Sequence, residues 1–141
     1  MPFLSVADEQ AVRQEFEKLK GPVKITVFAS ELGGENNQQT VALVREVAAL
    51  SDQISVQVLN PLIEREQAQA YGMDVTPALA VEGAADYGIR FLGLPAGYEF
   101  ANLIDSIIVA STGEPALSAA TRDALDGLGA DVTIKVFTTP T

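Results

Sequence analysis

The 141-residue sequence contains no cysteine, no histidine and no tryptophan. Without cysteine, the chain has no thiolate for nucleophilic, redox or metal chemistry. Without histidine, it lacks the usual general base near neutral pH and the commonest metal ligand. Its serines, such as Ser30 and Ser51, have no histidine to activate them, so a hydrolase triad is excluded. The sequence therefore predicts no catalytic residue, no metal site and no bound cofactor.

Long hydrophobic runs and basic stretches are also scarce. The longest apolar runs are only a few residues, far short of the ~20 residues that span a bilayer, and Met1–Leu4 does not resemble a signal peptide. Acidic residues outnumber basic residues 19 to 9, which gives a formal net charge of −10. An acidic surface does not attract nucleic acid or anionic membranes. We expect a cytoplasmic protein that binds neither of them.

The apolar residues that are present follow alternating helix and strand patterns. Ser5 and Asp8 form a capping-box pattern before a helix that should stop at Gly21–Pro22. The best-patterned helix has an apolar face that runs from Phe100 to Ile108, and Gly113 should close it. The other expected elements are strand 23–28, a helix after the loop 29–37 that ends near Ser51–Asp52, strand 54–59, helix 62–71, and short strands 78–81 and 88–92.

This order predicts an α/β fold with a β-α-β-α-β-β-α core over residues 1–113, in which a mixed four-stranded sheet is flanked by helices. Residues 114–141 lie outside that core. Ser118 opens a short helix with Leu125 and Leu128 on its inner side, and Val132–Phe137 repeats the pattern of Val23–Phe28. The repeat predicts the helix and first strand of a second, truncated unit.

An apolar strand left unpaired is an aggregation hazard. We therefore expect Val132–Phe137 to be ordered by pairing. Its partner would be either the edge strand Ile54–Leu59 or a second copy of the chain, which would make the protein a homodimer.

Several stretches carry a family resemblance. The most specific is Ile89–Phe100, which reads I-R-F-L-G-L-P-A-G-Y-E-F, and the terminal V-F-T-T-P-T of Val136–Thr141 supports it. The chain resembles the N-terminal thioredoxin/glutaredoxin-like unit of the two-unit protein disulfide oxidoreductases. It is also similar to the N-terminal region of the flavoprotein subunit of alkyl hydroperoxide reductase. The resemblance implies a thioredoxin-like, glutaredoxin-type fold and a second thioredoxin-like unit, with its C-x-x-C, that would start after Thr141.

The resemblance also identifies where a redox site would stand. Matched from Phe28, the cysteines of a C-x-x-C would fall on Gly34 and Asn37, within Gly34-Glu35-Asn36-Asn37. We call these four residues the vestigial loop. The resemblance further implies a cis bond at Thr76-Pro77, facing this loop.

Two interpretations stay open at each of these features. In the vestigial loop, Asn36 or Asn37 is expected as a simple N-cap, and the alternative is a site for a small anion or a partner's carboxylate. Thr76-Pro77 is either a scaffold turn retained by descent or a groove edge that pairs with an extended peptide. Three carboxylates that could suggest acid–base chemistry are expected on solvated helix faces instead: Glu64, Glu66 and Glu99.

The sequence therefore favours a redox-inactive thioredoxin-like unit with a degenerate active site. It would act in cell redox homeostasis as a scaffold or partner-recruiting module for a catalytic unit beyond Thr141. One alternative is a stand-alone peptide- or protein-binding module that uses the Thr76-Pro77 groove. Another is one half of an active disulfide reductase, so enzyme status remains open for the parent protein although this chain alone has no cysteine.

Overall fold

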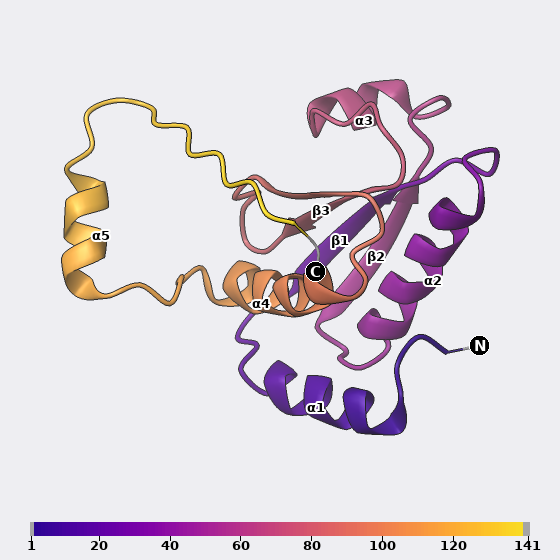
Figure 1. Cartoon of the computed structure of the whole chain (residues 1–141), viewed down its shortest axis with the longest axis horizontal. Coiled ribbons are helices and arrows are strands. Elements are labelled where there is room, and N and C mark those ends of the chain that lie inside the picture. Colours follow the sequence, from indigo (N-terminus) through magenta and orange to yellow (C-terminus); the bar gives the residue numbers. More distant parts are fainter. Residues whose placement is uncertain (1, 140–141) are drawn as a thin grey trace.

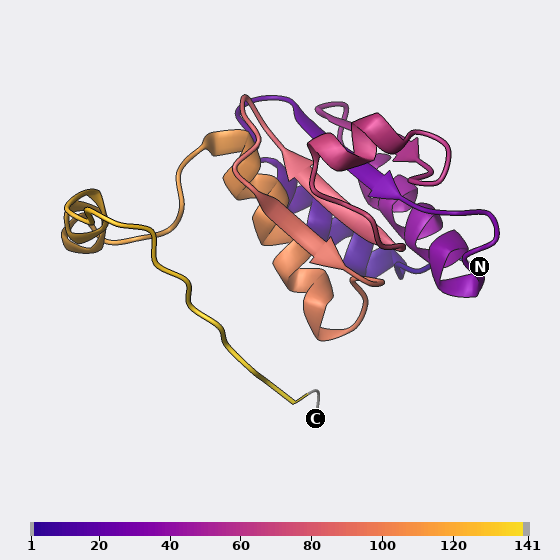
Figure 2. The ribbon, with the colours of Figure 1, turned by 90° about the horizontal axis from the view of Figure 1, so that it is seen from above.

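The computed structural model describes residues 2–139. Over that range the chain forms five helices and four strands, arranged as a sheet with helices on both sides (Figures 1 and 2). In chain order these are α1 (Val6–Phe16), β1 (Val23–Phe28), α2 (Glu35–Ala48), β2 (Ile54–Leu59), α3 (Arg65–Ala70), β3 (Ala78–Glu82), β4 (Ile89–Leu92), α4 (Tyr98–Thr112) and α5 (Ala119–Asp126).

The four strands form one mixed sheet in the order β2-β1-β3-β4. β1 pairs parallel with β2 and antiparallel with β3, and β4 pairs antiparallel with β3. The predicted element order and the mixed sheet are therefore confirmed. β2 lies at one edge of the sheet, as its alternating sequence pattern indicated.

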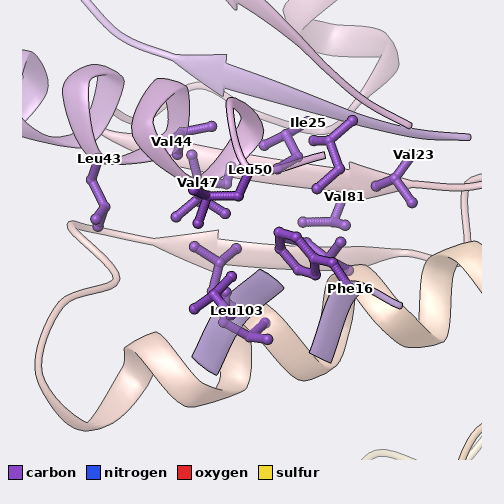
Figure 3. Close-up of a cluster of buried hydrophobic side chains, with 14 of the residues drawn as sticks. Phe16, Val23, Ile25, Leu43, Val44, Val47, Leu50, Val81 and Leu103 are labelled. Carbon is purple, nitrogen blue, oxygen red and sulfur yellow. The ribbon is translucent and has the colours of Figure 1, made fainter. Parts of the chain in front are cut away.

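The main core lies on the face of the sheet that carries α1, α2 and α4 (Figure 3). Ile25 and Val27 of β1 are fully buried there, because alternate residues of the central strand point into this layer. Side chains from all three helices pack against them, including Phe16, Val44 and Leu103. On the opposite face, Phe28 belongs to a smaller cluster under α3, together with Leu59, Ala68, Ala78 and Ala80.

The helix ends show where local sequence signals were accurate. The Ser5–Asp8 capping box is present: the Asp8 N–H donates to Ser5 Oγ at 3.2 Å, and the Ser5 N–H donates to Asp8 Oδ2 at 3.1 Å. Gly113 closes α4 in the left-handed conformation, with φ of 67°. Within residues 2–139, no helix is both long and apolar enough to cross a membrane.

Three helices are shorter than predicted. α1 ends at Phe16 and α2 at Ala48, so turns and loops bring the chain into the next strands. α3 begins at Arg65 rather than Leu62 because Asn60 organises a turn first: the Leu62 N–H donates to Asn60 Oδ1 at 3.0 Å.

The segment after α4 differs most from its prediction. The strand expected at Val132–Phe137 is not formed, and residues 131–139 have no regular secondary structure. α5 forms, but none of its residues is buried, and Leu125 and Leu128 are about half exposed rather than on an inner side. Figures 1 and 2 show α5 standing away from the sheet, and Figure 2 shows that the following segment also runs apart from the sheet. Residues 131–139 are all exposed to solvent.

Candidate functional site: the loop after β1 and the turn before β3

The vestigial loop and Pro77 meet at one end of the sheet. Phe28, the last residue of β1, pairs with Ala78, the first residue of β3. The chain leaves β1 through Ala29 towards the loop, while Pro77 directly precedes Ala78. The sheet register therefore places these two features at the same end of the sheet, where the resemblance implied that they would face each other.

Asn37 determines the conformation of the loop. Its side chain is 2% exposed, and its two amide atoms bond to the backbone on either side of the turn. Oδ1 accepts from the Ser30 N–H at 2.9 Å, and Nδ2 donates to the Gly33 carbonyl at 2.7 Å. An Asn that uses both ends of its amide in this way closes the loop on itself.

The Asn37 amide leaves no room for a side chain at Gly33. A Cβ placed on Gly33 would lie 2.4 Å from Asn37 Nδ2, well inside van der Waals contact. Gly34 then enters α2 with φ of 81°, a conformation that glycine adopts without strain. The loop thus depends on two glycines and one buried asparagine.

The predicted N-cap role of Asn36 or Asn37 is wrong. The N-cap of α2 is Gly34, and no side chain caps the helix there. Asn37 lies inside the first turn and points back into the loop, where it bonds to the N–H of the buried Ser30 and to the carbonyl of the exposed Gly33. Asn36 is exposed, and its carbonyl accepts from Thr40 Oγ1 at 2.7 Å.

The helix N-terminus still offers free backbone N–H groups, the feature on which the anion hypothesis rested. However, Glu35 places a carboxylate in the same first turn, and this carboxylate accepts from Gln39 Nε2 at 2.7 Å. No cluster of potential metal ligands occurs among residues 2–139. The described part of the loop therefore provides backbone donors and one acidic side chain, and it provides no nucleophile.

The Thr76-Pro77 bond is cis, as the resemblance implied. The turn is fixed on the β4 side by a hydrogen bond from the Gly93 N–H to the Pro77 carbonyl at 2.8 Å. Thr76 and Pro77 are both partly exposed, and Val75 is 46% exposed. The turn before β3 is thus partly open to solvent.

Tyr71 fixes the other end of this turn to the sheet. Its hydroxyl donates to Glu82 Oε2 at 3.2 Å, and its carbonyl accepts from Arg90 Nε at 3.2 Å. Lys24 Nζ lies 5.6 Å from the Tyr71 ring centroid and 3.1 Å from Glu82 Oε2. Hydrogen bonding to Tyr71 and then to Glu82 raises the pKa of Lys24. These contacts attach Tyr71, which directly follows α3, to β1, β3 and β4. They therefore fix the position at which the segment 72–77 begins.

Of the three carboxylates named from the sequence, Glu64 and Glu66 lie at the start of α3 and Glu99 lies at the start of α4. Glu66 and Glu99 are exposed in the first turns of α3 and α4. Glu64 differs from the expected solvated face: it is partly buried and accepts from the Asn60 N–H at 2.7 Å, which stabilises the turn before α3.

Sequence reasoning missed a groove of about 360 Å³ beside the vestigial loop. Its walls are the outer flank of α2, the loop from Ala29 to Glu31, and Val58 of the edge strand β2. Val58 is 39% exposed although it lies on the face of the sheet that α2 covers. The alternating pattern of residues 54–59 indicated an edge strand, but it did not indicate a groove.

The sheet order, the cis proline and the loop at the start of α2 define a thioredoxin-like α/β fold. No family model and no curated protein matches the sequence. Among solved structures, the chain is similar to the alkylhydroperoxide reductase AhpF from Enterococcus faecalis, with a TM-score of 0.80 and 22% identity over 89% of this chain and 61% of that chain.

Two further structures support the same fold. A protein disulfide oxidoreductase from Aeropyrum pernix aligns with a TM-score of 0.77 and 24% identity, over 91% of this chain and 56% of that chain. A mutant thioredoxin from Halobacterium salinarum aligns with a TM-score of 0.52 and 20% identity, over 76% of this chain and 86% of that chain. The chain thus spans between 56% and 61% of the length of the two larger structures.

Proposed function

We propose that this chain is a redox-inactive thioredoxin-like unit that acts as a scaffold or partner-recruiting module for a catalytic second unit beyond Thr141. One observation carries the proposal: Asn37 occupies the position matched to a redox cysteine, is 2% exposed, and bonds to the backbone of Ser30 and Gly33. A buried side chain that bonds to the backbone on both sides stabilises the loop, and it is not presented to solvent as a thiol at an exchange site would be.

The lengths of the similar structures support the second half of the proposal. The E. faecalis reductase and the A. pernix disulfide oxidoreductase are both longer than the part this chain matches. By analogy with the A. pernix disulfide oxidoreductase, we assign thiol–disulfide chemistry to a unit that would follow residue 141 of this chain. Val132–Phe137, which repeats the pattern of β1, would be the first strand of that unit. The proposal includes a role in cell redox homeostasis and a cytoplasmic location.

The sequence that follows Thr141 in the parent gene tests the scaffold role. A C-x-x-C directly after Thr141, within a second thioredoxin-like pattern, is the expected result. A stop codon at that point would contradict the scaffold role, and only the binding role would remain.

The binding role is a second candidate, in which the chain alone binds a peptide or protein at the Thr76-Pro77 groove. The exposed apolar side chains at this end of the sheet favour it: Leu32 is 93% exposed, Ile63 75% and Val75 46%. Apolar side chains that stay exposed near an open backbone edge are typical of a recognition surface.

A titration followed by backbone NMR tests the binding role. Extended apolar peptides should shift the Val75 and Thr76 amide signals, and the matched variant Val75→Asp should weaken the effect. Signal changes that spread over the whole chain, or none at all, would contradict a site at this turn.

A further inference from the structure

We infer that β2 is a dimerisation edge. Two copies of this chain pair antiparallel through their β2 strands, so that two four-stranded sheets become continuous. The occupant of the edge is therefore the same strand of a second copy. The inference goes beyond the proposed function and does not rest on it, because it uses only β2, α2 and the loop before α2.

The β2 edge has none of the features that keep edge strands from pairing. Natural edge strands are protected by charges, prolines, bulges or short length. The six residues of Ile54–Leu59 include no charged residue and no proline, and they pair with β1 in an unbroken register. The opposite edge, β4, is protected: it has four residues, and its Arg90 is paired with Asp86.

Alternate backbone groups of β2 point towards the free edge. On the β1 side, the Leu59 carbonyl accepts from the Ala29 N–H at 2.9 Å. In a parallel ladder only alternate residues of a strand bond to one neighbour, so the backbone groups of Val56 and Val58 point the other way. In the sheet that residues 2–139 form, β1 is the single neighbour of β2. A second β2 strand would satisfy these outward groups.

A twofold axis beside Val56 gives a self-complementary register. It places Val56 opposite its own copy and Ile54 opposite Val58, all on the face that α2 covers. Ser55 then lies opposite Gln57 on the other face, where both are exposed. A shift by one residue would turn the partner's sheet over and place Val56 opposite a polar residue. The alternation of β2 therefore favours one antiparallel arrangement.

The groove beside Val58 extends the contact from β2 to α2. Val41 and Ala42 of α2 and Val58 of β2 form its apolar walls, and its volume is about 360 Å³. In the antiparallel pair the two α2 helices lie on the same face of the joined sheet, one on each side of the axis. Both grooves then lie at the interface, and covering them adds apolar burial to the strand pairing.

The charged residues of the groove match across the twofold axis. Glu31 lies at the end of the groove next to the vestigial loop, and Arg45 lies in the last turn of α2. Antiparallel pairing brings the Glu31 end of each groove towards the Arg45 end of the other. Among residues 2–139, neither side chain forms an ion pair within the single chain. The dimer would give each of them an opposite charge.

The charge of the whole chain also favours this surface for self-association. Two copies with a formal net charge of −10 repel each other, so they can meet only where the surface is not acidic. β2 is uncharged, and the groove is lined by one acid and one base. The cavity between α1 and α4 is lined instead by three acids and no base: Asp8, Glu15 and Asp105.

The proposed interface lies on the side of the core away from α5. Figures 1 and 2 both show α5 on one side of the core and α2 on the other. A unit that followed α5 would start on the side away from β2. The pairing uses no residue after α4, so it does not depend on the segment 131–139.

Sedimentation of the intact chain tests whether the edge pairs. We expect a dimer fraction that rises with protein concentration. Val58→Glu should weaken the dimer about tenfold or more, because a carboxylate would be buried opposite an apolar residue. Val58→Ile keeps an apolar β-branched side chain and is the matched control, with the dimer retained. Ile134→Asp, in the segment after α5, should leave the dimer unchanged.

A charge reversal tests the antiparallel arrangement. Arg45→Glu should weaken the dimer about three- to tenfold, because both symmetric contacts would then bring two carboxylates together. The double variant Glu31→Arg/Arg45→Glu should restore it, since both charges are reversed. Circular dichroism of each variant verifies that the fold is retained.

Engineered cysteines test the register, because the chain has no cysteine of its own. A mixture of Ser55→Cys and Gln57→Cys chains should form a mixed disulfide dimer under mild oxidation, since these positions would lie opposite each other. Either variant alone should stay unlinked. Two copies of one position would be diagonal neighbours about 7–8 Å apart, and a disulfide joins Cα atoms up to about 7 Å apart.

Four results would overturn the inference. A monomer at all concentrations would show that the edge stays unpaired. A dimer that Val58→Glu does not weaken would place the contact on another face. Failure of Glu31→Arg/Arg45→Glu to restore the dimer would contradict the antiparallel arrangement. A disulfide that forms equally well with Gln57→Cys chains alone would contradict the register about Val56.

Discussion

β1 and the segment Val132–Phe137 have nearly the same sequence pattern and opposite structures. Both end in Val-Phe and alternate apolar residues with Lys and Thr. Ile25 of β1 is fully buried between β2 and β3, whereas Ile134 is 82% exposed and unpaired. The pattern supplies the tendency to form a strand, and neighbouring strands and helices supply the stability. What differs between the two regions is the set of neighbours that each one has.

The largest expected effect is a difference in stability between substitutions of Ile25 in β1 and Ile134 in the exposed segment. Ile25→Ala should lower the free energy of unfolding by about 2–5 kcal/mol, because it leaves a cavity in a close-packed core. Ile134→Ala, the matched change in the exposed segment, should leave it within about 0.5 kcal/mol. Chemical denaturation of both variants measures the difference. Equal effects would show that the segment is as well packed as β1.

The loop that follows β1 gives the next largest effect. Asn37→Ala leaves the Ser30 N–H and the Gly33 carbonyl each without a hydrogen-bond partner. It should lower the free energy of unfolding by about 1–3 kcal/mol. The matched control, Asn36→Ala, alters an exposed side chain and should change stability by less than about 0.5 kcal/mol. If both variants unfold at the same denaturant concentration, Asn37 does not hold the loop.

Removing a threonine hydroxyl should stabilise β1, at Thr26, and should have no effect in the exposed segment, at Thr133. Thr26 Oγ1 in β1 is buried with no hydrogen-bond partner. Thr26→Val keeps the shape and removes this hydroxyl, and should stabilise the chain by about 1 kcal/mol. Thr133→Val, in the exposed segment, should have no measurable effect on unfolding. Destabilisation by Thr26→Val would indicate that the hydroxyl has a partner in solution.

The smallest expected effect is the pH dependence of the stability that the Asp86–Arg90 pair contributes beside the edge strand β4. Hydrogen bonds from Arg90 lower the pKa of Asp86 to about 2, below its usual 3.8. A lowered pKa in the folded state contributes stability above the unfolded pKa, so this contribution is lost as pH falls from about 4 to 2. Because the pair is partly exposed, it should amount to less than about 1 kcal/mol.

Comparing the unfolding free energy of the intact chain and Asp86→Asn at pH 7 and pH 2.5 isolates the Asp86–Arg90 pair. We expect the difference between the two proteins to shrink at the lower pH. A constant difference would contradict the lowered pKa.

The sequence alone was sufficient for elements whose pattern is local or strongly periodic. β1 was predicted to the residue, and the Ser5–Asp8 capping box and the Gly113 closure are present as expected. These features depend on side chains a few residues apart, so short-range rules capture them. The cis bond at Thr76-Pro77 came from the family resemblance rather than from any local rule.

The larger errors involve partners outside the local sequence pattern. Asn37 was expected to cap a helix, but its role depends on Ser30 across the loop. Val132–Phe137 was expected to form a strand, yet a strand needs a neighbour that no residue pattern can guarantee. The groove beside Val58 is also lined by residues of α2 and of the loop after β1, which the alternation of β2 does not encode.

The central claim is that this unit performs no thiol–disulfide exchange of its own. An insulin-reduction assay with a dithiol donor tests it directly, because exchange requires an attacking thiolate and the chain has none. We predict precipitation of insulin at the rate of the dithiol alone, whatever the concentration of the chain. Acceleration that rises in proportion to the concentration of a pure preparation would show that the unit does catalyse thiol–disulfide exchange.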